Sequence, residues 1–155
     1  MSDSMPLLAV GDRVPAFSLR DDHGRTWTEA DLSGRTVVLY FYPKDDTPGC
    51  TREACAFRDG LEAFAERNAS VLGISADDEA SHVRFRDKYS LNHPLLADPE
   101  HRLCDAFGVW GLQRWRDQTY EGIARTTFIV KDGVITSVFP DVDPTGHAER
   151  VLAAL

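Results

Sequence analysis

Two cysteines five residues apart give the strongest chemical signal in this chain. Cys50 and Cys55 follow an apolar segment that ends at Pro43, and a Thr-Pro-Gly turn over residues 47–49 comes directly before Cys50. The residues after this turn have helical spacing, so Cys50 would lie in the first turn of a helix. Unpaired backbone N–H groups and the positive end of the helix dipole favour the thiolate there, and the thiolate is the reactive form of cysteine. We therefore expect Cys50 to be a catalytic or redox-sensing nucleophile.

The spacing of the two cysteines restricts how they can react with each other. On an ideal helix, five residues rise roughly 7.5 Å and turn about 140°, so the Cα atoms of Cys50 and Cys55 would lie roughly 8.7 Å apart. A disulfide needs about 4.4–6.8 Å between Cα atoms. The first helical turns must therefore unwind if these cysteines bridge. This separates the pair from a Cys-x-x-Cys disulfide oxidoreductase and suggests that Cys50 reacts first and Cys55 resolves it.

Groups near Cys50 would stabilise its thiolate. Thr47 lies three residues earlier, and its hydroxyl can point at the sulfur across the turn, while Gly49 lets the backbone come close and exposes N–H groups. A nearby cation favours a thiolate as well. Arg52 is near in sequence, but Arg125 is the stronger candidate. It directly precedes a predicted strand, and sites in α/β folds gather at strand ends.

The apolar pattern predicts alternating strands and helices. Residues 36–42 (Thr-Val-Val-Leu-Tyr-Phe-Tyr) lack polar alternation, which is typical of a central strand covered on both faces. Further strands are predicted at 16–19, 25–28, 70–75, 94–97, 126–130 and 134–139, with hairpin turns at 21–24 and 131–133. Helices are predicted at 28–32, 50–67, 79–89, from the cap Asp98 to about 108, and from the cap Thr145 to 155, with a long loop over 109–122. This order predicts one α/β domain over 1–155 with a central mixed β-sheet, flanking helices and an N-terminal β-hairpin.

Composition narrows the class of protein. The formal net charge of -8 argues against binding to nucleic acid or to an anionic membrane surface, because both need clustered Lys and Arg. Three cysteines are too few for a secreted disulfide framework, and an odd number cannot all pair within the chain. The N-terminus also lacks the basic start and long apolar core of a signal peptide. We expect thiol chemistry in the cytoplasm.

A known family has the same pattern of residues. Residues 43–51 (Pro-Lys-Asp-Asp-Thr-Pro-Gly-Cys-Thr) resemble the active-site signature of peroxiredoxins. The longer match through 53–55 (Glu-Ala-Cys) and 57–59 (Phe-Arg-Asp) resembles the bacterioferritin comigratory protein (PrxQ) subfamily. The likeness covers nearly the whole chain, with further matches at 11–12, 15–17, 108–111, 125–128 and 146–148. Residues 114–119 depart from the family pattern, which usually has more Gly and Lys there.

The resemblance implies a thioredoxin-like fold and an antioxidant enzyme that reduces hydrogen peroxide and organic hydroperoxides. Cys50 matches the peroxidatic cysteine, Cys55 the resolving cysteine, and Pro43 the proline that shields the active site. Thr47 and Arg125 match residues that hydrogen-bond the peroxide and stabilise the thiolate. The peroxide site implied in this way consists of Thr47, Gly49, Cys50 and Arg125. An intramolecular Cys50–Cys55 disulfide, reduced by thioredoxin or a similar dithiol, would make this an atypical 2-Cys peroxiredoxin. It would be a monomer without a metal or organic cofactor.

Several alternatives stay open from the sequence. Glu53 either joins the active-site hydrogen bonds or only favours the helix start. Cys104 reads as a buried small residue, with a second resolving thiol as the alternative. His101 and Cys104 alone do not make a zinc site. A non-enzymatic redox sensor would use the same disulfide but react slowly with peroxide. The combination of Thr47, Cys50 and Arg125 favours the enzyme.

Overall fold

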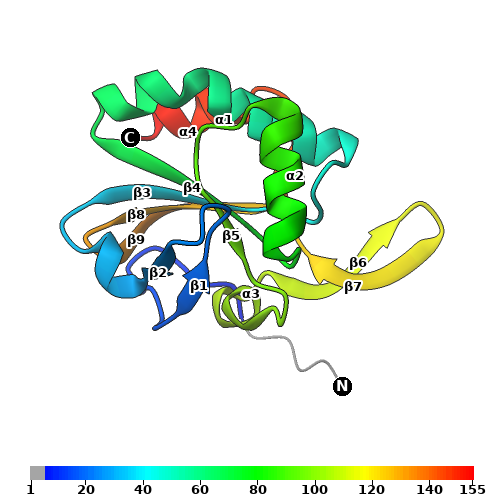
Figure 1. Ribbon diagram of the computed structural model, residues 1–155. Coiled ribbons are helices and arrows are strands. Elements are labelled where there is room, and N and C mark those ends of the chain that lie inside the picture. Colours follow the sequence, from blue (N-terminus) through cyan, green and yellow to red (C-terminus); the bar gives the residue numbers. More distant parts are fainter. Residues whose placement is uncertain (1–5) are drawn as a thin grey trace.

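The computed structural model describes residues 6–155, except for the side chain of Trp115, and builds them around a five-stranded sheet (Figure 1). The strands are β1 Ser18–Arg20, β2 Thr26–Thr28, β3 Thr36–Phe41, β4 Ala69–Ser75, β5 Leu95–Ala97, β6 Trp110–Trp115, β7 Gln118–Ile123, β8 Thr126–Lys131 and β9 Val134–Phe139. The helices are α1 Pro48–Glu66, α2 Glu79–Tyr89, α3 Arg102–Phe107 and α4 His147–Ala153, with a 3-10 turn η1 at Glu29–Leu32.

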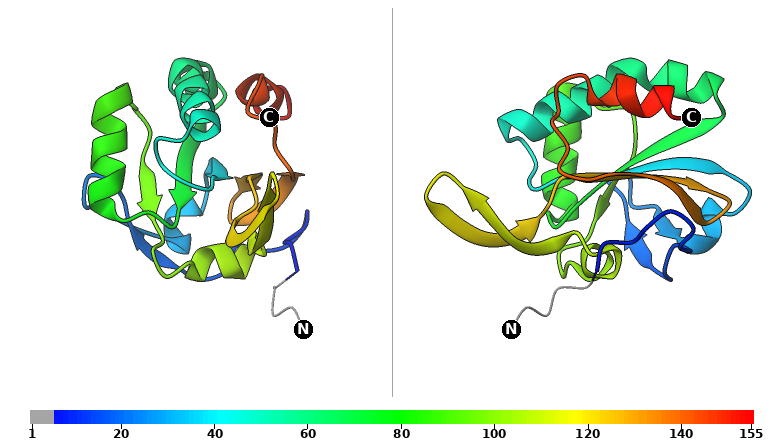
Figure 2. Two further views of the ribbon diagram at one scale, coloured as in Figure 1. Left: turned by 90° about the vertical axis from the view of Figure 1, so that its right-hand side faces the viewer. Right: turned by 180° about the vertical axis from the view of Figure 1, so that it is seen from behind.

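The central sheet is mixed, as the sequence predicts. Its strand order is β5-β4-β3-β8-β9, with β3, β4 and β5 parallel and with β8 and β9 antiparallel to their neighbours. Helices α1, α2 and α4 lie on one face of this sheet, and α3 lies on the other face together with the β1–β2 hairpin (Figures 1 and 2). The predicted N-terminal hairpin is therefore present, although its strands are shorter than expected.

From Val37 to Phe41, strand β3 has buried side chains on both faces of the sheet. Val37, Leu39 and Phe41 belong to the core under α3, whereas Val38 and Tyr40 belong to the core under α1. Successive side chains of a strand point to opposite faces, so an unbroken apolar sequence suits a strand covered on both sides. The end of β3 is thereby fixed in position, and the segment that leads to Cys50 begins there.

The prediction of a long loop over 109–122 is wrong. This segment forms the β6–β7 hairpin, whose strands pair from Trp110 opposite Ile123 to Trp115 opposite Gln118. The hairpin projects from the body of the molecule (Figure 1). Its two-residue turn is Arg116 and Asp117, with Arg116 in the left-handed region at φ 57°. Glycine or asparagine usually occupies such a position, so the sequence gives no turn signal there.

Two predicted helix starts also need correction. Helix α3 begins at Arg102, after a turn in which the His101 N–H donates to the Asp98 carbonyl. The Asp98 carboxylate still accepts from the Cys104 N–H at 2.9 Å, so it caps the helix from outside the first turn. In α4, the residue before the helix is Gly146 in the left-handed conformation, and Thr145 is not the cap. The other predicted helices and strands are present, with boundaries shifted by a few residues.

The described residues also bear on membrane-spanning helices and on the domain boundaries. Among the helices of residues 6–155, none has the length and apolar character needed to cross a membrane. Residues 1–5 lie outside the described part, so the single domain over 1–155 stays a prediction.

Candidate active site

Cys50 is the third residue of α1, because the helix begins two residues earlier than predicted, at Pro48. A proline suits the first helical position, where no N–H partner is needed. The backbone N–H of Cys50 is one of the first four in the helix, which have no partner within it. The Cys50 side chain is in the core beneath α1, with the residue only 1% exposed. Its thiol is free, as are those of Cys55 and Cys104.

Arg125 contacts the Cys50 sulfur because the strand that follows it pairs with β3. Strand β8 runs antiparallel to β3, and Phe41 at the end of β3 pairs with Thr126 at the start of β8. This register places Arg125 beside the segment that leads into α1. Arg125 Nη2 donates to Cys50 Sγ at 3.3 Å. A Cβ atom on Gly49 would lie 3.0 Å from the same nitrogen, so glycine keeps this approach open.

Glu53 shares the guanidinium with Cys50. Arg125 Nη1 donates to Glu53 Oε1 at 2.7 Å, and Glu53 is 1% exposed. Burial raises the pKa of Glu53 to about 7, although Arg125 acts to lower it. The structure thus places Glu53 inside the hydrogen-bonded group that contains Cys50.

A cleft of about 780 Å³ lies over this group. Its walls are Pro43, Lys44, Thr47, Pro48, Gly49, Ala76, Trp110, Gln118, Tyr120, Glu121, Gly122 and Arg125. Four predicted site residues, Pro43, Thr47, Gly49 and Arg125, therefore face the same space. The β6–β7 hairpin supplies one wall of the cleft. The sequence pattern does not predict this wall, because it indicates a loop over the segment.

The Thr47 side chain does not have the predicted orientation. Its hydroxyl donates to the Lys44 carbonyl oxygen at 2.9 Å rather than to the Cys50 sulfur. Thr47 remains the residue before α1 and lines the cleft. Rotation about one side-chain bond would free its hydroxyl hydrogen for a molecule bound there.

Cys55 and Cys104 have different surroundings. Cys55 is half-buried on the same helix as Cys50, and this helix continues without a break to Glu66. The helix includes Asp59 and Gly60, a pair that is common in turns and could have broken or kinked it. Cys104 is fully buried in α3, and burial, with the nearby Asp98, raises its thiol pKa strongly. These surroundings fit a small core residue, because a thiol that stays protonated is a poor nucleophile.

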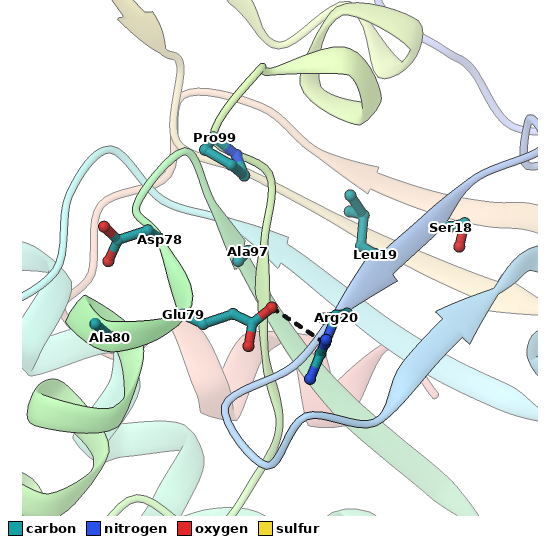
Figure 3. Close-up of a pocket in the computed structure, with 8 residues that line it drawn as sticks. All are labelled: Ser18, Leu19, Arg20, Asp78, Glu79, Ala80, Ala97 and Pro99. Carbon is teal, nitrogen blue, oxygen red and sulfur yellow. Dashed lines mark ion pairs between the residues drawn. The ribbon is translucent and has the colours of Figure 1, made fainter.

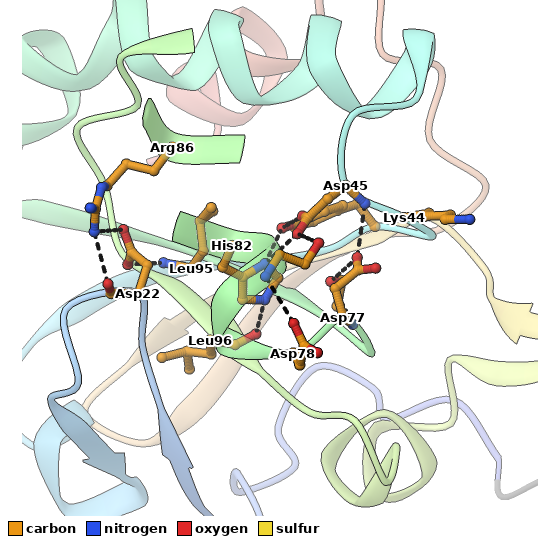
Figure 4. A network of polar contacts seen from close by, with 12 residues as sticks. Asp22, Lys44, Asp45, Asp77, Asp78, His82, Arg86, Leu95 and Leu96 are labelled. Carbon is orange, nitrogen blue, oxygen red and sulfur yellow. Dashed lines mark hydrogen bonds and ion pairs between the residues drawn. The ribbon is translucent and has the colours of Figure 1, made fainter. Parts of the chain in front are cut away.

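A buried polar network, which the sequence analysis missed, holds the loop before Cys50. The Asp45 carboxylate accepts from the Tyr42 hydroxyl at 2.6 Å and from the Ser81 hydroxyl at 2.8 Å, and it lies 2.7 Å from His82 Nδ1 (Figure 4). His82 Nε2 faces the Leu96 carbonyl oxygen at 2.9 Å. Both ring nitrogens thus face acceptors. Although burial acts to lower it, the pKa of His82 is raised by Asp45.

This network binds the loop to α2 rather than providing ligands. Asp45, Asp77 and His82 have the spacing of a metal-binding group among the described residues. However, the Asp77 carboxylate already accepts from the Asp45 N–H at 2.8 Å and from the Ser75 hydroxyl at 2.7 Å. The ligand atoms are therefore used within the protein. Asp45 and His82 lie far apart in sequence, which is why no local pattern pointed to them.

A second hollow, of about 450 Å³, lies between β1 and the start of α2 (Figure 3). An ion pair between Arg20 Nε and Glu79 Oε1, at 3.2 Å, spans it. Both side chains are largely exposed to solvent, and pairs of this kind contribute little to stability. None of the predicted site residues lines this hollow, so the cleft over Cys50 is the better candidate site.

Comparisons with known proteins agree over most of the chain. The AhpC/TSA family profile matches residues 10–138. Peroxiredoxin Bcp of Bacillus subtilis is 42% identical over 149 residues, covering 96% of this chain and 95% of that protein.

Solved structures agree as well. A cysteine-to-serine mutant of PrxQ from Xylella fastidiosa superposes with a TM-score of 0.90 at 34% identity, covering 97% of this chain and 96% of that one. The bacterioferritin comigratory protein of Xanthomonas campestris gives 0.84 at 36% identity, covering 89% and 88%. The structures of that protein, a trapped intermediate and ligand complex, concern its alkyl peroxide reduction activity.

These likenesses confirm the thioredoxin-like α/β fold expected from the sequence. They extend over nearly the full length of the chain and of the proteins it matches, and they include the segment that carries Cys50. The chain therefore belongs to the AhpC/TSA family and is a peroxiredoxin of the Bcp/PrxQ subfamily.

Proposed function

We propose that this peroxiredoxin reduces hydrogen peroxide and organic hydroperoxides through the Cys50 thiolate. The observation that carries the proposal is the contact of 3.3 Å between Arg125 Nη2 and Cys50 Sγ at the start of α1. A guanidinium and free helix N–H groups favour a negative charge on this sulfur. Gly49 and Arg125, the neighbours of this sulfur, line the cleft, although Cys50 itself is buried behind its wall.

The chemical step is a two-electron transfer. The thiolate attacks one peroxide oxygen, an S–O bond forms, and the O–O bond breaks. Cys50 becomes a sulfenic acid, and the leaving oxygen takes a proton to give water or an alcohol. Arg125 and the N–H groups at the helix start would stabilise the charge that moves onto the peroxide oxygens. The Thr47 hydroxyl would join them after turning away from the Lys44 carbonyl oxygen. Pro43 lines the cleft and would shield the thiolate, the role that the family resemblance implies for it.

Cys55 then resolves the sulfenic acid as an intramolecular disulfide with Cys50, with loss of water. The two residues lie on one continuous helix, so its first turns must unwind for the sulfurs to meet. Glu53 lies between them and is held by Arg125 at 2.7 Å. Unwinding must therefore break this ion pair, which makes the first turns of α1 a switch between the reactive and the resolving form.

A dithiol reductant completes the cycle. We propose thioredoxin or a similar protein for this role, acting in the cytoplasm on a monomeric peroxiredoxin that needs no metal or organic cofactor.

Trp110 and Tyr120 on the β6–β7 hairpin give the cleft an apolar wall that suits the organic part of a hydroperoxide. The alkyl peroxide reduction activity of the Xanthomonas campestris relative supports organic hydroperoxides as substrates.

The test of this function is hydroperoxide-dependent oxidation of NADPH through thioredoxin reductase and thioredoxin. We expect multiple turnovers with hydrogen peroxide and with cumene hydroperoxide. A rapid-mixing measurement of the reaction with peroxide separates the enzyme from a redox sensor. A slow reaction without thioredoxin-coupled turnover would favour the sensor and contradict the proposal.

Replacing Cys55 tests the resolving step separately. We expect the Cys55→Ser variant to react once with peroxide at an unchanged rate and then to stop, because the sulfenic acid has no internal thiol to condense with. A dimedone adduct on Cys50, or overoxidation to the sulfinic acid, should appear in the mass spectrum. Unchanged thioredoxin-coupled turnover in Cys55→Ser would exclude Cys55 as the required resolving residue.

A further inference from the structure

One guanidinium binds two groups that are both negative when ionised. Arg125 Nη2 contacts Cys50 Sγ at 3.3 Å, and Nη1 contacts Glu53 Oε1 at 2.7 Å. Both acidic side chains are buried, so water screens their mutual repulsion weakly. A negative charge on either group therefore makes ionisation of the other less favourable. The two groups therefore compete for the one guanidinium.

The second carboxylate oxygen of Glu53 has no donor. Glu53 Oε2 has no hydrogen-bond partner within residues 6–155, although the atom is buried. A charged oxygen without a donor is costly in such a place, whereas a protonated carboxyl avoids most of this cost. Burial also raises the pKa of Glu53 to about 7 when Arg125 is its partner. A thiolate on the other side of Arg125 acts in the same direction, as a like charge.

Within residues 6–155, two other titratable side chains near Glu53 are neutral at neutral pH. His147 of α4 lies 3.9 Å from Oε2, and its Nε2 is 2.8 Å from the Thr127 hydroxyl. Burial lowers the pKa of His147 to about 4, so the ring is neutral at neutral pH. Tyr40 of β3 also faces Glu53, and burial raises its phenol pKa, so it stays neutral as well. Arg125 is therefore the cation that Glu53 and Cys50 share.

We propose that Glu53 holds a proton while Cys50 is a thiolate and releases that proton when the sulfur is oxidised. Glu53 then acts through Arg125 as a positioning residue. Before the reaction, the Cys50 thiolate is the only negative charge of this pair that Arg125 stabilises. After the reaction the sulfur is neutral, and Arg125 stabilises the Glu53 carboxylate instead. This inference rests on the peroxidase function proposed above.

The proton balance of the chemical step makes the proposal measurable. A thiolate and a hydroperoxide give a neutral sulfenic acid and an alcohol with the uptake of one proton: the S–O bond forms, the O–O bond breaks, and the leaving alkoxide is protonated. If Glu53 releases a proton in the same step, less than one proton is drawn from the solvent. Without an ionisable group at residue 53, the full proton must come from the solvent.

The experiment uses the full chain with Cys55→Ser, in which the reaction stops at the sulfenic acid. One equivalent of cumene hydroperoxide is mixed with the protein and a pH indicator in weak buffer at about pH 7 to about pH 8. The thiolate absorbance first shows at which pH Cys50 is ionised in each variant. We expect Cys55→Ser to take up well under one proton per sulfenic acid, and Glu53→Gln in the same background to take up one. The matched control is Glu62→Gln, an exposed acid on the same helix, which should behave as Cys55→Ser.

Equal proton uptake with and without Glu53 would overturn the proposal. Infrared difference spectra of Cys55→Ser give a second test that does not depend on whether the Glu53→Gln protein folds. A protonated-carboxyl band should be present in the reduced protein and lost on oxidation, and a band that persists would contradict the proposal. If no sulfenic acid forms at all, the peroxidase function itself fails, and the inference fails with it.

Discussion

The Cys50→Ser variant should lose peroxidase activity altogether. We expect its thioredoxin-coupled rate to fall by at least about 10³-fold, because a hydroxyl is not ionised at neutral pH and cannot replace the thiolate. The substitution is nearly isosteric at a buried position, so the fold should be retained. The coupled assay measures the rate, and circular dichroism checks the fold.

The matched control for this variant is Cys104→Ala. Cys104 is fully buried in α3 and lines no part of the cleft, so its loss should leave the peroxide reaction close to that of the unmodified protein. A small loss of stability, about 1 kcal/mol, is expected from the removed sulfur. Full activity in Cys50→Ser would show that Cys50 is not the nucleophile, and loss of activity in Cys104→Ala would give the third cysteine a chemical role.

Replacing Arg125 should slow the reaction with peroxide without stopping it. We expect Arg125→Met to lower the second-order rate constant by about 10²–10³-fold, because a donor aimed at the reacting atoms is lost. Glu53, left without its partner, should stay protonated rather than unfold the protein, because burial raises its pKa and Arg125 no longer acts to lower it. Stopped-flow fluorescence with hydrogen peroxide measures the rate constant.

Two further arginine variants sharpen this prediction. Arg125→Lys should recover only part of the rate, since an ammonium is a point charge and lacks the two separate nitrogens that contact Cys50 and Glu53. Arg52→Met removes the arginine that is nearer in sequence. Its exposed side chain contacts Thr145 at 3.5 Å, and we expect little change in rate. If Arg52→Met were slow and Arg125→Met fast, the assignment of the cation would be wrong.

The sequence predicts the parts of the site that depend on local patterns. The placement of Cys50 in the first turn of a helix follows from the turn before it and the helical spacing after it, and α1 bears this out. The central strand is recognisable because its unbroken apolar residues suit a strand covered on both faces. Arg125 stands next to a predicted strand, and antiparallel pairing of that strand with β3 brings it to Cys50.

Contacts between distant segments could not be predicted in this way. Asp45 and His82 are 37 residues apart, and neither side chain has a local signal that marks the other as its partner. The contact between His147 and Glu53 depends on how α4 packs against α1. The β6–β7 hairpin was missed because its turn contains Arg116 in a left-handed conformation that glycine or asparagine usually marks. Pairing across the hairpin outweighs this local preference.

The central claim is that α1 must unwind at its start for Cys50 and Cys55 to join. Hydrogen–deuterium exchange of the reduced protein and of protein oxidised with one equivalent of hydroperoxide tests it most directly, with peptide mapping to identify the disulfide. We predict a Cys50–Cys55 disulfide together with a loss of protection over residues 48–59, while the central sheet stays protected. The same disulfide with unchanged protection over 48–59 would contradict the account.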